Sequence, residues 1–333
     1  MPLYIAQLMF SGPVRFGTDA LELEDSEETL HSDSLFSALC HSWALLHGKG
    51  ELDALLAEFH ESPPFLLSSG FVFSGDSFFL PMPQSSFPGF EAAEGQTGCS
   101  YLDSRLGDTR FLCFEDFEAW AGAERVPYER FRENAARYAA SFRPSGRTRV
   151  AVSRDTVSSS PFLCSAVRFS EGCGLYSILR FRDDGLVAKV EQALRFLGET
   201  GVGGERTYGY GRFEPVLRAA DPRWEKLFKR RGDLYLTLSL CHPEMPAADY
   251  FQGSTYRLLR RRGWCHSPFT NAQPKRKTVT MFAEGSVFQH EMKGHLADVT
   301  PSSWDRAALH PVYRYGYALM VPLRSAGPRP IRI

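Results

Sequence analysis

Residues 201–211, Gly-Val-Gly-Gly-Glu-Arg-Thr-Tyr-Gly-Tyr-Gly, combine five glycines with one arginine and two tyrosines. Glycine adopts positive φ and lets a backbone approach a ligand closely. Arginine can clamp a phosphate, and a tyrosine ring can stack on a base. Flexible linkers consist mainly of glycine and small polar residues and do not require an arginine or tyrosines. This composition therefore favours contact with phosphates and bases. The candidates are Gly201, Gly203, Gly204, Arg206, Tyr208 and Tyr210.

The elements around this loop decide what kind of site it can be. Apolar residues at helical spacing predict a helix over 184–197, and residues 211–217 read as a strand. The glycine-rich loop 198–211 therefore connects a helix to a strand. Dinucleotide and P-loop sites need the reverse order, and the glycine spacing fits neither GxGxxG nor GxxxxGK[ST]. We therefore expect no nucleotide cofactor, and no other cofactor is indicated.

The remaining pattern predicts an α+β fold. A strand over 3–10 precedes a helix that begins at Ser32, a plausible N-cap, and ends at Gly48. Strands follow over 65–80, then a helix over about 115–142 and a hairpin over 165–182. With the helix and strand around the loop, this order is βαββαβ, the ferredoxin-like (RRM-like) arrangement. We predict two such units: residues 1–220 with an insertion around 83–160, and a smaller, degenerate unit over 221–333.

Charge is segregated along the 333 residues. The net charge is −1, but 31 of the 38 basic residues are arginine, and they cluster around residues 143–154, 229–231, 260–262 and 275–277. This pattern favours local basic grooves on a neutral body. The seven cysteines form no CxxC pair, and no metal site is signalled. No run of about 18 apolar residues and no leader pattern is present, so we expect a cytoplasmic protein without membrane contact.

Several further segments carry a resemblance to a known family. They are His31–Leu39, Arg149–Arg154, Gly263–Phe269, Arg276–Thr278, Phe282–Phe288 and His310–Gly316. Together with the glycine-rich loop, they resemble the RAMP superfamily of CRISPR systems, and within it the fourth, Csm-type subunit of the type III-A effector complex. Relatives commonly carry an acidic residue before the second arginine of the Arg149–Arg154 segment, whereas this chain has Ser153.

The resemblance implies a non-catalytic RNA-binding subunit of an antiviral interference complex. Such a subunit holds the 5′ repeat-derived handle of the CRISPR RNA and contacts the large polymerase-type subunit on one side and a backbone-filament RAMP subunit on the other. Single-stranded RNA is held by arginine, backbone N–H groups and aromatic faces. The RNA-binding candidates outside the loop are His31, Ser32, Arg147, Arg149, Arg154, Trp264, Lys275, Arg276 and Lys277.

An enzyme is the alternative interpretation. Asp33 resembles the aspartate that serves target-RNA cleavage in related backbone subunits, but its place in the first turn of a helix is explained by the helix dipole. His31 or His41 could act as the general base of a RAMP endoribonuclease that processes precursor CRISPR RNA. No His/Lys/Tyr constellation, GxSxG, HExxH or HD pair supports this reading. We therefore predict no catalytic residue.

Overall fold

The computed structural model describes residues 1–17, 26–86, 88–90, 109–152, 159–244, 251–267, 270, 273–304 and 310–325. They form a mixed α/β fold whose paired strands are antiparallel, as predicted. None of the described helices combines the length and the apolar character that a bilayer crossing requires.

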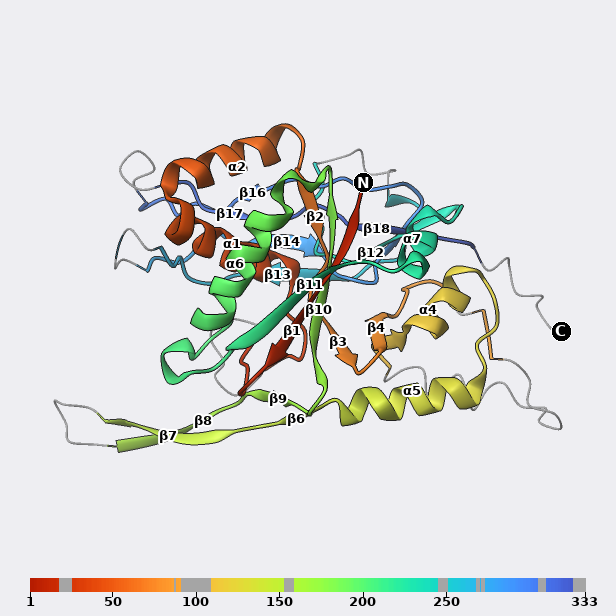
Figure 1. Cartoon of the computed structure of the whole chain (residues 1–333), viewed down its shortest axis with the longest axis horizontal. Helices are drawn as coiled ribbons and strands as arrows, with labels where there is room; N and C mark the ends of the chain where they lie inside the picture. Colours follow the sequence, from red (N-terminus) through yellow and green to blue (C-terminus); the bar gives the residue numbers. More distant parts are fainter. Residues whose placement is uncertain are drawn as a thin grey trace.

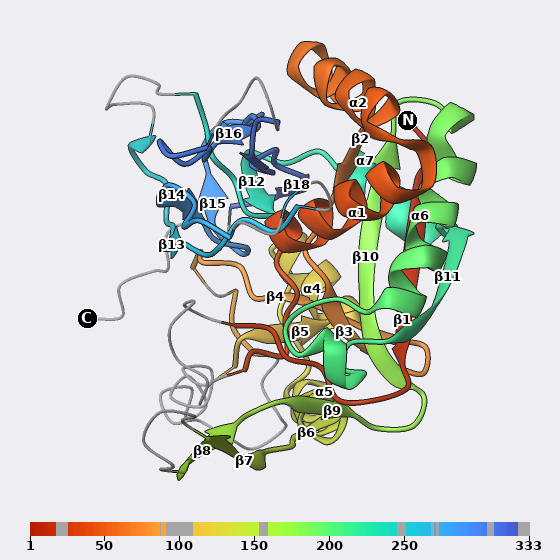
Figure 2. The same cartoon turned by 90° about the vertical axis from the view of Figure 1, so that its left-hand side faces the viewer.

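The larger sheet is built mainly from the first 220 residues and has the strand order β11-β1-β10-β3-β4-β5, with β2 also paired to β10. Helices α1 and α6 lie side by side along it, and α2 packs on α1 (Figures 1 and 2). The elements are β1 (Leu3–Phe10), α1 (Ser32–His47), α2 (Lys49–Glu61), β2 (Phe65–Leu67), β3 (Phe71–Ser74), β4 (Ser77–Pro81), β5 (Phe111–Cys113), β10 (Cys173–Phe181), η1 (Asp184–Leu186), α6 (Val187–Thr200), η2 (Arg206–Tyr208) and β11 (Phe213–Ala219).

The predicted insertion around 83–160 contributes β5 to the larger sheet and, together with the residues that follow it to 169, forms two helices and a long ribbon. Its elements are α4 (Phe114–Ala121), α5 (Tyr128–Ala140), β6 (Phe142–Pro144), β7 (Arg147–Val152), β8 (Ser159–Cys164) and β9 (Val167–Phe169). The prediction of one helix over 115–142 was wrong, because the chain turns at Gly122 and Ala123 and Pro127 then precedes α5. The hairpin over 165–182 was also wrong: β9 pairs with β6, while β10 pairs with β1, β2 and β3. The pair β7–β8 extends away from the body (Figure 1).

The last third of the chain is mostly short strands. Its elements are α7 (Pro222–Lys229), β12 (Leu234–Thr237), β13 (Leu258–Arg261), β14 (Val279–Phe282), β15 (Val287–Phe288), β16 (Ala297–Asp298), β17 (Tyr313–Arg314) and β18 (Met320–Leu323). Strands β15, β12 and β18 form a three-stranded sheet, while β13 with β14 and β16 with β17 form two antiparallel two-stranded sheets.

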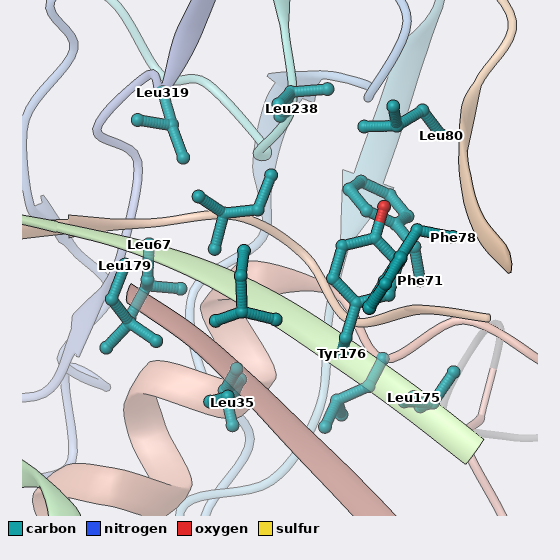
Figure 3. Packing of buried hydrophobic residues seen from close by; sticks show 14 of the residues in the cluster. Leu35, Leu67, Phe71, Phe78, Leu80, Leu175, Tyr176, Leu179, Leu238 and Leu319 are labelled. Carbon is teal, nitrogen blue, oxygen red and sulfur yellow. The ribbon is translucent and has the colours of Figure 1, made fainter. Parts of the chain in front are cut away.

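One hydrophobic core spans both halves of the chain. Leu35 of α1 and Tyr176 of β10 belong to the same buried cluster as Leu238 and Leu319 from the C-terminal part (Figure 3). Burial of this shared apolar surface stabilises the two halves against each other. The border at residue 220 stays a prediction, and the core itself is continuous across it.

Candidate nucleic-acid interface

The start of α1 lies where the N-terminal and C-terminal halves meet. The Ser32 backbone N–H donates to Ser69 Oγ (2.8 Å), and Ser32 Oγ accepts from the backbone N–H of Leu240 (3.0 Å). Ser32 is fully buried and is the first residue of the helix, while His31 takes the N-cap position. The predicted capping role of Ser32 was wrong: its hydroxyl joins the two halves of the chain.

Asp33 anchors a buried ion network. Arg261 of β13 approaches it with two parallel contacts of 3.0 Å, from Nε to Oδ2 and from Nη2 to Oδ1, and Arg314 of β17 donates to the same carboxylate. Burial alone would raise the pKa of Asp33, but the two guanidinium groups lower it well below its usual range. The carboxylate therefore stays ionised and ties α1 to the C-terminal strands.

His31 belongs to a second buried network beside the first. Its Nδ1 lies 2.8 Å from Oε1 of Glu284, and its Nε2 lies 3.0 Å from Oε2 of Glu27. Burial opposes the charge of the imidazole, yet the two carboxylates outweigh it and raise the pKa of His31 to about 9. His31 is therefore an imidazolium at neutral pH, with its Nδ1 donating to Glu284 and its Nε2 in an ion pair with Glu27.

A groove with a volume of about 500 Å³ opens above these networks. None of the described residues that line it carries a carboxylate. Its walls come from the segment after β1, the start of α1, the glycine-rich loop, β13 with the segment that follows it, and β17. The lining residues with basic or aromatic side chains are Arg15, Phe16, His31, His41, Arg206, Arg261, Arg262, Trp264, His266, Arg276 and Arg314.

Two histidines on the groove wall have lowered pKa values. His41 of α1 and His266 meet edge to face, with ring centroids 5.2 Å apart. Burial, His266 and Arg206 lower the pKa of His41 to about 4. Burial, followed by Arg206 and Arg276, also lowers the pKa of His266. Both imidazoles are therefore neutral at pH 7, first because burial disfavours their charged form and second because the neighbouring cations repel it.

The predicted loop glycines line this groove, but their backbone groups also contact the chain itself. A Cβ at Gly201 would lie 2.6 Å from the carbonyl oxygen of Tyr210, and one at Gly203 would lie 2.4 Å from that of Arg15. The N–H of Gly201 donates to Leu197 O (2.7 Å), and the N–H of Gly204 donates to Arg15 O (2.8 Å). These glycines brace the wall of the groove, and two of their N–H groups are already used.

The two tyrosines of the loop occupy different environments. Tyr210 is 3% exposed and belongs to the interior, whereas Tyr208 is 69% exposed. The guanidinium carbon of Arg149, from the projecting strand β7, lies 4.0 Å from the centroid of the Tyr208 ring. Arg149 also pairs with Glu205. The structure therefore brings Arg149 onto the exposed ring of Tyr208, while Tyr210, whose ring centroid lies 6.0 Å from the same guanidinium carbon, is buried beneath them.

The remaining predicted residues separate into three groups. Trp264, 48% exposed, and Arg276 line the groove, and Lys275 Nζ lies 5.1 Å from the Trp264 ring centroid. Arg147 on β7 and Lys277 are exposed and lie outside the groove lining. Arg154 lies outside the described residues.

Sequence reasoning missed several groove residues. Arg15 follows the first strand and Arg314 lies in the last third of the chain, so no local spacing connects either of them with the glycine-rich loop. Arg261 and Arg262 belong to the run at 260–262, which was noted as a basic cluster without being chosen as a site. That basic run was the feature of the sequence from which Arg261 and Arg262 could have been predicted as site residues. His266, two residues after the predicted Trp264, has no such feature around it.

Comparison with known proteins connects this architecture with a family. A model of the RAMP superfamily matches residues 8–214, and the CRISPR Csm4 C-terminal domain matches residues 230–323. A CRISPR system Cms protein Csm4 from Thermococcus onnurineus (strain NA1) is 27% identical over 331 residues, covering 95% of each chain. One from Streptococcus thermophilus is 25% identical over 312 residues, covering 92% of this chain and 96% of the relative.

Solved structures share the fold. A chain in the crystal structure of a Csm1–Csm4 cassette in complex with pppApA matches with a TM-score of 0.63 at 22% identity, covering 98% of this chain and 100% of that chain. A chain of a Csm3–Csm4 subcomplex in the type III-A CRISPR-Cas interference complex has the same TM-score at 13% identity, with 97% and 99% covered. These matches confirm the predicted resemblance to the fourth, Csm-type subunit. Since the superfamily model covers well over half of its residues, the chain belongs to the RAMP superfamily.

Proposed function

We propose that this chain is a non-catalytic RNA-binding subunit of a type III-A CRISPR-Cas interference complex and that its groove holds the 5′ handle of the CRISPR RNA. The observation that carries the proposal is the groove itself: its described lining has no carboxylate and holds four arginines in addition to Arg261 and Arg314, which pair with Asp33 beneath it. Polyanions bind such surfaces because phosphates release counterions and pair with the cations.

Single-stranded RNA suits this groove better than a duplex. Unstacked bases can lie on aromatic faces while the backbone follows the cations. Trp264 lines the groove and is half exposed, and Tyr208, which is not among the lining residues, is exposed two residues after Arg206. Arg206 and Arg276 line the same groove as Trp264 and supply phosphate contacts.

The partners follow from the relatives. Structures of relatives contain Csm1 together with Csm4, and Csm3 together with Csm4. We infer that this chain bridges the same two kinds of neighbour, a large polymerase-type subunit and a backbone-filament RAMP subunit, in antiviral defence. The handle would then lie at the junction of the three subunits.

The strand order supports a ferredoxin-like first unit over residues 1–220. Without the insertion, the elements run β1, α1, β2 with β3, β10, α6 and β11, and the sheet order β11-β1-β10-β3 places the first and third strands in the centre. The three-stranded sheet β15-β12-β18 would be the remnant of a second such unit over 221–333.

Two of the three side chains considered for catalysis, Asp33 and His31, have other tasks, and the lowered pKa of the third, His41, makes it a weak base at neutral pH. The Asp33 carboxylate is occupied by Arg261 and Arg314, and both nitrogens of His31 contact carboxylates. A general base needs a free acceptor within reach of the substrate. A processing endoribonuclease is therefore the less favoured function.

The test is to incubate the purified chain with a fluorescent RNA that carries the host's repeat-derived handle. We expect binding that weakens steeply with added salt, with the RNA recovered intact, and ultraviolet crosslinks to peptides of the glycine-rich loop and of the segment around Trp264. Metal-independent cleavage by the chain alone would favour the processing enzyme. Salt-insensitive binding, or crosslinks confined to surfaces outside the groove, would contradict the proposed site.

A further inference from the structure

Glu205 holds an unusual backbone conformation at the turn of the glycine-rich loop. Its φ is +60°, and among the described residues Ala123 is the other non-glycine residue with positive φ. A side chain in this left-handed region costs about 1 kcal/mol or more relative to glycine. Glycine is abundant in this loop, so a glutamate at this position indicates that its side chain contributes something.

The carboxylate of Glu205 pairs with Arg149, which comes from the projecting strand β7. Both side chains are only about one-fifth exposed. The same guanidinium lies over the ring of Tyr208, 4.0 Å from its centroid. Arg149 is therefore held on one side by a carboxylate and on another by an aromatic face. Partial burial makes such a pair stronger than an ordinary surface ion pair.

This contact joins the ribbon directly to the glycine-rich loop, whereas their other connection runs through the segment after β1, which bonds Val167 and Gly204. In Figure 1, β7 and β8 extend away from the body, whereas the glycine-rich loop lies between α6 and β11. A two-stranded ribbon by itself is marginally stable in water. The pair Arg149–Glu205 anchors the base of the ribbon to the wall of the groove.

We propose that Glu205 is a positioning residue, which holds Arg149 flat on Tyr208 so that ribbon and loop present one prearranged contact to single-stranded RNA. The inference has two parts: Glu205 anchors Arg149, and the anchored Arg149 and Tyr208 contact RNA. The second part, the RNA step, rests on the proposed function; the first, the anchoring step, does not. Prearrangement raises affinity because the ordering of flexible side chains is completed before binding.

The anchoring step is tested on the full chain without RNA, by amide hydrogen exchange of residues 147–150. Glu205→Gln removes the charge and keeps the size, while Glu205→Gly removes the carboxylate and also relieves the backbone. Glu199→Gln, at an exposed position near the end of α6, is the matched control. We expect exchange in β7 to accelerate about tenfold in both Glu205 variants, the loss of one charge-assisted hydrogen bond, and to stay unchanged in the control.

The RNA step is tested by comparing Glu205→Gln with Glu199→Gln, because each removes one negative charge. Positioning predicts that Glu205→Gln binds a single-stranded RNA about threefold more weakly than the control, by partial loss of a charge-assisted contact. Unchanged exchange in both Glu205 variants would overturn the inference. Faster exchange with RNA affinity equal to the control would show an anchor without a role in binding. Faster exchange in a chain that binds no RNA would refute the proposed function and leave the anchor standing.

Discussion

Two groups of charges meet at the start of α1, and they differ in how their charges are satisfied. In the buried network, Asp33 faces Arg261 and Arg314, and His31 faces two glutamates. In the groove just above, the described lining residues include no carboxylate. Cations with internal partners hold the two halves of the chain together. The groove arginines other than Arg261 and Arg314 have no carboxylate among the described lining residues and are available to an external anion.

The largest expected effect comes from breaking the buried network. Asp33→Asn leaves two buried guanidinium groups without their counter-charge, which should lower the free energy of unfolding by about 3–5 kcal/mol. Chemical denaturation of the variant measures this, with Asp76→Asn in the exposed β3–β4 turn as the control. A fully stable Asp33→Asn chain whose reconstituted complex no longer cuts target RNA would instead mark Asp33 as catalytic.

The second prediction concerns the pH dependence of stability. The pKa of His31 in the folded chain is about 9, above its ordinary value of 6.5. The contribution of His31 to the free energy of unfolding is therefore fully present below pH 6.5 and is lost as the pH rises through 9. The difference in unfolding free energy between the parent chain and His31→Gln should shrink by roughly 3 kcal/mol between these limits. Denaturation curves at a series of pH values test this. A difference that stays constant from pH 6 to pH 10 would refute the charged state of His31.

The third prediction separates bracing from ligand contact within the glycine-rich loop. Gly203 has φ +89° and no room for a Cβ, whereas at Gly204 the nearest atom to an added Cβ is a mobile guanidinium nitrogen of Arg15, 3.2 Å away. Gly203→Ala should therefore lower the free energy of unfolding by roughly 2 kcal/mol, and Gly204→Ala by less than about 0.5 kcal/mol. Equal stability of the two variants, with RNA binding lost in the first, would mean that Gly203 serves the ligand.

Local patterns in the sequence were sufficient to predict the helices that flank the site. Helical spacing of apolar residues predicted α1 and α6, and the glycine cluster predicted the loop between α6 and the following strand, which in the structure lines the groove. These features depend on neighbours in the chain, so a single sequence contains them. The mixed α/β class followed from the same local patterns.

The partners across the groove could not be predicted in this way. Arg261 and Arg262 are adjacent, yet Arg261 is buried against Asp33 while Arg262 is exposed and lines the groove. Successive side chains of an extended segment point in opposite directions, and the sequence does not say which one points inward. The carboxylate that decides it lies more than 200 residues away. Which arginine pairs within the fold and which can bind an external anion is therefore decided by a long-range contact.

The most direct test of the comparison between paired and available cations is the salt dependence of RNA binding. The variant is Arg206→Ala/Arg276→Ala in the groove, and the matched control is Lys189→Ala/Arg195→Ala on the exposed side of α6. Affinity for a fluorescent handle RNA is measured by anisotropy between low and high salt for the parent chain and both variants.

The slope of log affinity against log salt is negative, and each phosphate contact on a single strand adds about 0.7 to its magnitude. If the groove holds the RNA, removing two arginines should reduce the magnitude of the slope by about 1.4. The control variant should keep the slope of the parent chain. The affinity of the groove variant at moderate salt should fall by roughly tenfold or more. An unchanged slope in the groove variant, or an equal loss in the control, would contradict the claim that these groove arginines form the RNA site.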